Sequence, residues 1–345
     1  MRPMPSIRNR ITLRAAALLW LAASLLPAAG FPSAELSNGQ LRLTIFLPDA
    51  RNGFYRASRF DWSGVIGDLE YKGHRYYGQW FSRVDPNVHD YTYEGGQVIA
   101  SPCSAGTGPV EEFQTNGSAL GWDDARPGGT FIKIGVGVLR KDDKPYDFAK
   151  LYPIVDGGKW SVSKHAGSVE FEQQLHDAVM GYGYVYRKVV RLVAGQPEMV
   201  LEHSLRNTGS RTIESTVYDH NFLVLDGQAP GPDFAITVPY QIQPGPAGSG
   251  PVEVRGNHIV YLKAIEGHAV GAIRATGFGA SASDNDIRIE NRKVGAGMHI
   301  TGDRPLAALS LWSIKTTLAM EPTIRMKIEP GGEFQWKISY RYYVK

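Results

Sequence analysis

The chain has 345 residues, 43% of them hydrophobic and 21% charged, with 37 Lys and Arg against 34 Asp and Glu. The first 30 residues hold four arginines and no acidic residue, so the remainder has 33 basic and 34 acidic side chains and is almost neutral. This balance excludes a basic nucleic-acid-binding protein, which concentrates Lys and Arg against phosphates, and the hydrophobic content excludes a disordered chain.

The first predicted element is an uncharged apolar run, Ala15–Leu26, which follows the arginines and ends at the small residues of Pro27–Gly30. This order is typical of a secretory signal peptide. The run has 12 residues, whereas a membrane-spanning helix takes about 20 apolar residues. We therefore expect residues 1–30 to be removed and residues 31–345 to be exported, to the periplasm or outside the cell. The alternative is a cytoplasmic protein with a buried N-terminal helix.

The rest of the chain has the period-two pattern of β-strands. Glycine and proline, 39 and 21 residues, divide the chain into short segments. Between Tyr182 and Leu205, apolar residues alternate with polar ones on both sides of a turn at Gln196–Pro197. A second such pair, joined at Pro330–Gly332, predicts a β-hairpin from Ile324 to Tyr342. Helical periodicity is scarce, and only Tyr146–Tyr152 and Leu306–Trp312 could each form a turn or two.

No internal boundary divides residues 31–345. Strand-like segments continue on both sides of the Pro- and Gly-rich stretch Gln243–Pro251, which we interpret as a surface loop. The lone Cys103 cannot form an internal disulfide, so the core alone must stabilise the fold. We expect an all-β protein, a single large antiparallel β-sandwich with few short helices.

Common catalytic motifs are missing. The sequence has no G-x-S-x-G, no H-E-x-x-H and no P-loop. The acidic residues of Asp284–Glu290 lack the spacing of an EF-hand, so we interpret them as a solvated turn. No metal site and no cofactor are predicted.

Polar residues interrupt several apolar strands instead. His220 lies within Val217–Leu225, Glu321 ends the apolar run from Leu318, and Glu111 and Glu112 precede Phe113. A buried carboxylate has a raised pKa, which suits a general base, and a histidine is the natural proton donor opposite it. The alternative is structural: a core histidine satisfied by backbone carbonyls, and an ion pair of Glu321 with a nearby cation, Arg325 or Lys327.

Two blocks of the chain resemble the aldose 1-epimerase (galactose mutarotase) superfamily. The first comprises a Gly-Tyr turn, two strands, a polar turn and a strand that ends in a histidine motif: Gly181–Gly183, Asn207–Gly209 and Asp219–Gly227. The second comprises a Leu-x-x-Glu-Pro strand, a Pro-Gly turn and an aromatic last strand: Leu318–Pro322, Pro330–Glu333 and Tyr340–Tyr343. The order and spacing of the blocks agree over the C-terminal half. The resemblance implies a large sandwich with a saccharide cleft on a concave sheet.

The resemblance also implies roles for individual residues. Glu321 is the expected general base, taking the proton of the anomeric hydroxyl, while His220 is the expected general acid at the ring oxygen. Asp219 and Asn221, beside the histidine, are expected to contact the sugar. Four tryptophans are candidate stacking platforms, although core packing is the alternative for each: Trp62, Trp80, Trp122 and Trp312.

The N-terminal half departs from the superfamily. Mutarotases have an Asn-Arg-Ile and a Leu-His-Gly-Gly segment there, whose Arg and His bind sugar hydroxyls, and this chain has neither. Order along the chain makes Glu112 the candidate at the arginine position and Lys133 the candidate at the histidine position.

Two functions therefore follow from the sequence. The first is a carbohydrate-active isomerase that interconverts the anomers of a small saccharide or glycan end. The second is a non-catalytic carbohydrate-binding β-sandwich module. A glycan lyase or hydrolase is disfavoured because no acid pair at such spacing is evident.

Overall fold

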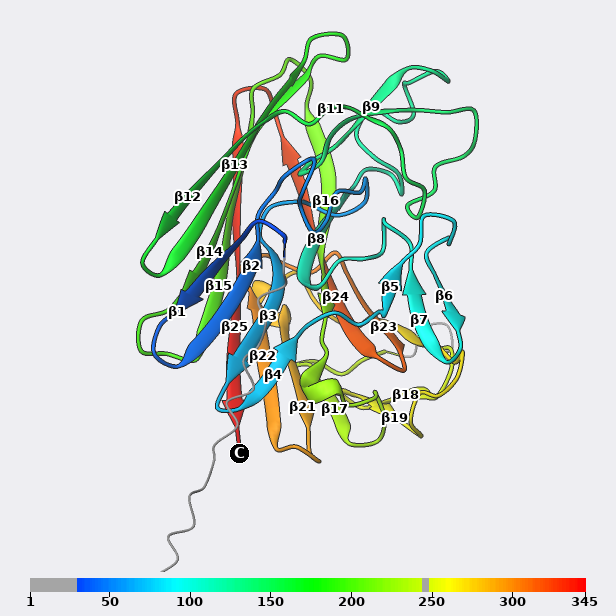
Figure 1. Ribbon diagram of the computed structural model, residues 1–345, viewed down its shortest axis with the longest axis vertical. Coiled ribbons are helices and arrows are strands. Elements are labelled where there is room, and N and C mark those ends of the chain that lie inside the picture. Colours follow the sequence, from blue (N-terminus) through cyan, green and yellow to red (C-terminus); the bar gives the residue numbers. More distant parts are fainter. Residues whose placement is uncertain (1–29, 244–247) are drawn as a thin grey trace, which may run out of the picture. The chain divides into compact units, whose positions relative to one another are not determined.

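Two antiparallel sheets packed face to face form the body of residues Phe31–Lys345 (Figure 1). The computed structural model describes residues 30–243 and 248–345. The predicted signal peptide lies outside these residues, apart from Gly30. No helix among the described residues is long and apolar enough to cross a membrane.

The larger sheet has ten strands. In spatial order they are β12 (Lys159–His165), β13 (Ser168–Asp177), β14 (Tyr182–Leu192), β15 (Glu198–Asn207), β25 (Glu333–Val344), β22 (Ala296–Gly302), β21 (Asp286–Asn291), β17 (Phe234–Thr237), β19 (His258–Tyr261) and β18 (Val252–Arg255). The smaller sheet has five strands. They are β20 (Gly271–Ala275), β23 (Ala308–Ile314), β24 (Thr317–Ile328), β16 (Ile213–Phe222) and β8 (Gly108–Gln114).

Three small sheets complete the fold. The first is β1 (Ser33–Ser37), β2 (Leu41–Phe46), β3 (Val65–Tyr71) and β4 (His74–Tyr77). The second is β11 (Ile154–Asp156), β10 (Gly137–Arg140) and β9 (Thr130–Lys133). The third is β5 (Arg83–Val84), β7 (Gln97–Ala100) and β6 (Tyr91–Glu94), in which β5 and β7 run parallel. The helical elements among the described residues are two 3₁₀ turns, Leu225–Gly227 and Ala282–Asp284.

The five-stranded sheet is the inner layer, because both of its faces are covered. Strand side chains alternate between the faces. Val217 of β16, Met320 of β24 and Leu223, directly after β16, face the ten-stranded sheet and join its core. Val110 and Phe222 face the other way, into a second core built with residues of the N-terminal segments. That second face carries the cavity described below.

The all-β fold class is confirmed, and so are the strands of Tyr182–Leu205, which are β14 and β15. Two finer predictions are wrong, the helical turn at Leu306–Trp312 and the C-terminal hairpin. Leu306–Trp312 is mostly strand, since β23 begins at Ala308. Tyr146–Tyr152, the other candidate for a turn, lies in a loop with a single turn. The C-terminal pair is not a hairpin: β24 pairs with β16 and β23, while β25 pairs with β15 and β22. Both strands bury one face in the shared core, so their alternation is the same as that of a true hairpin.

Candidate functional site

His220 reaches the covered face of the inner sheet because of its position on β16. Tyr218, His220 and Phe222 lie on this face, and the odd-numbered residues between them lie on the other. β16 keeps one register on β24, with Tyr218 opposite Thr323 and Leu223 opposite Leu318. The same register places His220 opposite Glu321.

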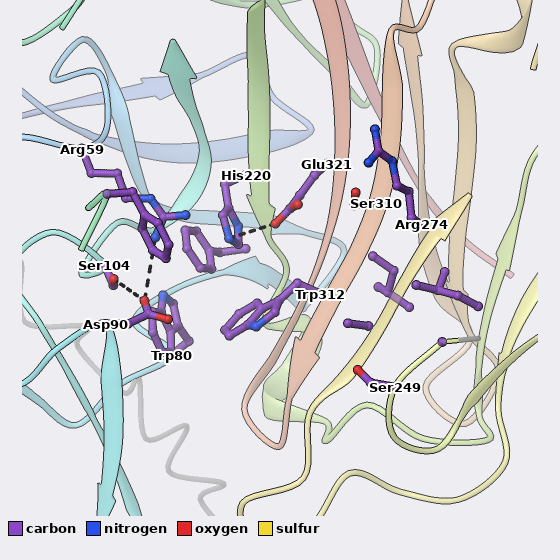
Figure 2. A pocket seen from close by; sticks show the side chains of 16 residues that line it. Arg59, Trp80, Asp90, Ser104, His220, Ser249, Arg274, Ser310, Trp312 and Glu321 are labelled. Carbon is purple, nitrogen blue, oxygen red and sulfur yellow. Dashed lines mark hydrogen bonds and ion pairs between the residues drawn. The ribbon is translucent and has the colours of Figure 1, made fainter. Parts of the chain in front are cut away.

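The two side chains are in contact. His220 Nε2 lies 3.1 Å from Glu321 Oε1, and the side chains are 6% and 20% exposed (Figure 2). Among the described residues, the other ring nitrogen, Nδ1, is buried and has no hydrogen-bond partner. The histidine and carboxylate that the sequence predicted as a catalytic pair therefore form one polar unit.

This pair lies on the wall of a cavity of about 460 Å³. Strands β16, β24, β23 and β20 supply one side of it, and loops of the N-terminal part supply Arg59, Trp80, Asp90 and Ser104. Figure 2 shows these side chains facing His220 and Glu321 across the cavity. The volume lies within the range of small-molecule sites.

Aromatic rings hold His220 in place. Phe222, two residues further along β16, stacks on the imidazole with ring centroids 3.8 Å apart, and Trp80 stacks on the other side of Phe222 at 5.3 Å. Trp312 meets His220 edge-on at 5.6 Å. Trp80 and Trp312 both line the cavity. The imidazole therefore has little freedom to turn away from Glu321.

The surroundings shift the pKa values of both groups. Burial raises the pKa of Glu321 to about 7. Burial, together with the nearby cation Arg59, lowers the pKa of His220 well below its usual value. A carboxyl that ionises near neutral pH is suited to taking and returning a proton.

A buried ionic network lies behind the cavity wall. Arg59 Nε donates to Glu112 Oε2 over 2.8 Å, and Lys133 Nζ donates to Glu112 Oε1 over the same distance. The Tyr218 hydroxyl also donates to Glu112 Oε2, at 2.5 Å. Burial alone would raise the pKa of Glu112, but Lys133 and Arg59 outweigh it and hold this pKa below its usual value. The network fixes the guanidinium that borders the cavity.

This arrangement corrects the prediction for Glu112 and Lys133. Both side chains are fully buried and neither lines the cavity. They bind each other and support Arg59, so the arginine at the cavity comes from a different part of the chain than the sequence suggested.

Three further candidates also lie away from the cavity. Asp219 and Asn221 lie on the opposite face of β16 from His220, where Asn221 bonds the Tyr340 hydroxyl and the Met320 carbonyl. Trp122 packs against Phe131, Tyr146 and Tyr152. The structure does not bring these side chains to the pair or to the cavity. Trp62 lines a different cavity, together with Trp160.

The sequence did not predict three residues at or behind the cavity wall. Tyr218, which bonds Glu112 and Arg59 behind the wall, lies two residues before His220 on the strand, so period-two alternation was a signal for it. Arg59 and Asp90 belong to loops that nothing in the sequence connects to His220. In the structure, Arg59 Nη1 lies 3.8 Å from Asp90 Oδ1, and the Ser104 hydroxyl donates to the same oxygen over 2.6 Å (Figure 2).

No three metal-ligating side chains of the described residues converge on one point. What converges is an acid–base pair, an anchored arginine and two tryptophans around a cavity. Such a site can bind a small polar molecule with apolar faces and can move protons on it.

Comparison with known proteins identifies the fold. No family model and no curated protein matches the chain. Solved structures do match: a galactose mutarotase-like protein from Lactobacillus casei shares 13% identity at a TM-score of 0.52, covering 90% of this chain and 100% of that chain. A putative aldose 1-epimerase from Escherichia coli K12 shares 12% identity at 0.51, covering 92% and 100%. An aldose epimerase homologue from C. elegans shares 13% identity at 0.51, covering 91% and 99%. The chain thus has the galactose mutarotase-like fold, as its sequence motifs predicted.

Proposed function

We propose that this protein is a sugar isomerase that interconverts the anomers of a cyclic saccharide through Glu321 and His220. One observation carries the proposal: the contact of 3.1 Å between His220 Nε2 and Glu321 Oε1 on the wall of a cavity lined by tryptophans. The fold, whose similar structures include aldose 1-epimerase homologues, supports it.

The proposed reaction needs only proton transfers. Glu321 takes the proton of the C1 hydroxyl as the bond between C1 and the ring oxygen breaks and C1 becomes a carbonyl. The electron pair of that bond goes to the ring oxygen, which receives a proton from His220. Rotation about the C1–C2 bond and the reverse transfers close the ring as the other anomer. Each group acts once as acid and once as base, so the pair returns to its initial state.

The protonation of the pair matters for this cycle. The pKa of Glu321 is raised to about 7 and that of His220 is lowered. At pH values between these two pKa values, the pair holds one proton. The reactive form has this proton on His220 and is one of the two arrangements of the singly protonated pair.

Arg59 and the tryptophans have supporting roles. Arg59 keeps its position through Glu112 and Tyr218 and offers a fixed cation to sugar oxygens. Trp80 and Trp312 provide apolar surfaces against the faces of a sugar ring. The same features would serve a binding module without catalysis, so the decisive test is the reaction rate.

The test is anomer exchange in free sugars, followed by NMR for wild type, His220→Ala and Glu321→Gln. We expect each variant to lose at least about 100-fold in kcat, since general acid–base groups contribute 10²–10⁴-fold. The kcat of the double variant should be no lower than that of the less active single variant, because the two groups act as a unit. Glu214→Gln, an exposed position on β16, is the matched control. Wild-type rates equal to buffer for all sugars, with sugar binding detected by calorimetry, would favour the binding module instead.

A further inference from the structure

Arg274 extends the row of polar residues that contains the pair. It lies on β20 opposite Ser310 of β23, and Ser310 lies opposite Glu321 of β24. With His220 opposite Glu321, four neighbouring strands each contribute one residue to a single row on the cavity face. Neighbouring strands are about 4.8 Å apart, so the backbone of Arg274 lies roughly 10 Å from that of Glu321. Figure 2 shows Arg274 beyond Ser310, on the side of Glu321 away from His220.

The other charged groups of the cavity have partners. Arg59 is bonded to Glu112, Asp90 accepts from Ser104, and Glu321 contacts His220. Arg274 is exposed and lines the cavity. Within residues 30–243 and 248–345, no carboxylate lies within ion-pair distance of its guanidinium, and no hydrogen bond engages it. The cavity thus presents one uncompensated, permanently charged cation to a bound molecule.

We propose that the saccharide of this site carries an anionic group, a carboxylate or a sulfate ester, which Arg274 binds while the anomeric carbon lies at Glu321 and His220. This inference rests on the proposed function, because it assumes that a sugar occupies the cavity. A guanidinium matches the two oxygens of such an anion with parallel hydrogen bonds. Ser310 lies in the row between Arg274 and Glu321 and faces the middle of the sugar. The row therefore selects both the reacting end of the substrate and its charge.

The experiment compares matched sugars that differ in charge. Glucose, glucuronic acid and glucose 6-sulfate are equilibrated by wild type, Arg274→Gln and Arg325→Gln, and kcat/KM is measured for each. Arg325 is the control, since it is an exposed arginine on β24 that does not line the cavity. Binding of methyl glucuronoside and methyl glucoside, which cannot open their rings, is measured in parallel by calorimetry.

We expect wild type to prefer one of the two acidic sugars over glucose by about 10- to 100-fold, the worth of a hydrogen-bonded charge pair. Arg274→Gln should reduce this ratio to near one, and Arg325→Gln should leave it unchanged. The sugar that is preferred identifies carboxylate or sulfate as the anion.

The outcomes separate this inference from the proposed function. Anomer exchange without any preference for acidic sugars overturns the inference and leaves the function standing. An Arg274-dependent preference for methyl glucuronoside without any anomer exchange supports the inference and overturns the isomerase. A preference that survives in Arg274→Gln shows that another residue binds the anion, which also overturns the inference.

Discussion

Glu111 and Glu112 are consecutive on β8, and each anchors a separate buried ionic network on its own face of the inner sheet. Glu111 points between the two large sheets, where it contacts Lys188 at 2.5 Å and His203 at 2.7 Å. Glu112 points toward the cavity side and binds Arg59 and Lys133. Two adjacent carboxylates therefore support two different parts of the molecule.

This separation makes Glu111→Gln and Glu112→Gln a matched pair. Each variant leaves a buried cation without its partner, and we expect each to lower the free energy of unfolding by about 3–5 kcal/mol. Only Glu112→Gln should change catalysis. The charge of Glu112 raises the pKa of Glu321, whereas Arg59 lowers it, so loss of that charge should lower this pKa. Chemical denaturation and the pH profile of kcat/KM measure the two effects, and equal profiles for both variants would contradict this assignment.

Activity should fall as pH rises above about 7. Above the raised pKa of Glu321, about 7, the pair loses the single proton that the reaction needs. Below the lowered pKa of His220, a second proton blocks the base. We expect kcat/KM to form a plateau on the acid side of neutrality and to decline about tenfold per pH unit above it. A rate that rises through pH 7, after subtraction of the buffer reaction, would be incompatible with one shared proton.

Glu321→Gln should stabilise the protein at alkaline pH. The pKa of Glu321 is raised from 4.5 to about 7 in the folded state, so ionisation costs stability progressively between these values and fully above pH 7. The cost is about 3 kcal/mol by linkage. The variant, which cannot ionise, should therefore unfold at a higher temperature than wild type at pH 8 and at nearly the same temperature at pH 4. Thermal unfolding at both pH values checks the sign, and a stability difference that does not change with pH would refute the raised pKa.

Trp312→Ala should weaken sugar binding. Trp312 is half-buried at the cavity and lies edge-on to His220. Loss of this apolar surface should raise KM about tenfold, since about 1.4 kcal/mol corresponds to a factor of ten. Trp312→Phe should restore most of the affinity, and Trp160→Ala, at the other cavity, is the control. Equal effects of the two alanine variants would indicate general destabilisation instead.

The strands could be predicted because alternation follows directly from the geometry of the backbone. The same rule separates Asp219 and Asn221 from His220, because neighbouring residues of a strand lie on opposite faces. The sheet to which a strand belongs was harder to predict, since β24 and β25 each bury one face in the same core. His220 and Glu321 were found together through family motifs. Arg59 could not be found in this way, because its role depends on a loop that folds against β8. No local sequence pattern encodes that contact.

The turn at Pro330–Gly332 joins β24, an interior strand of the five-stranded sheet, to β25, an interior strand of the ten-stranded sheet. β24, which carries Glu321, lies between β23 and β16, and β25 lies between β15 and β22. One continuous segment thus supplies an interior strand to each layer. The backbone of Glu321 belongs to this interior strand, so it should leave its position only when the five-stranded sheet unfolds. Amide hydrogens of β24 should accordingly exchange at the rate of global unfolding, which makes the proposed base part of the most slowly exchanging region of the protein.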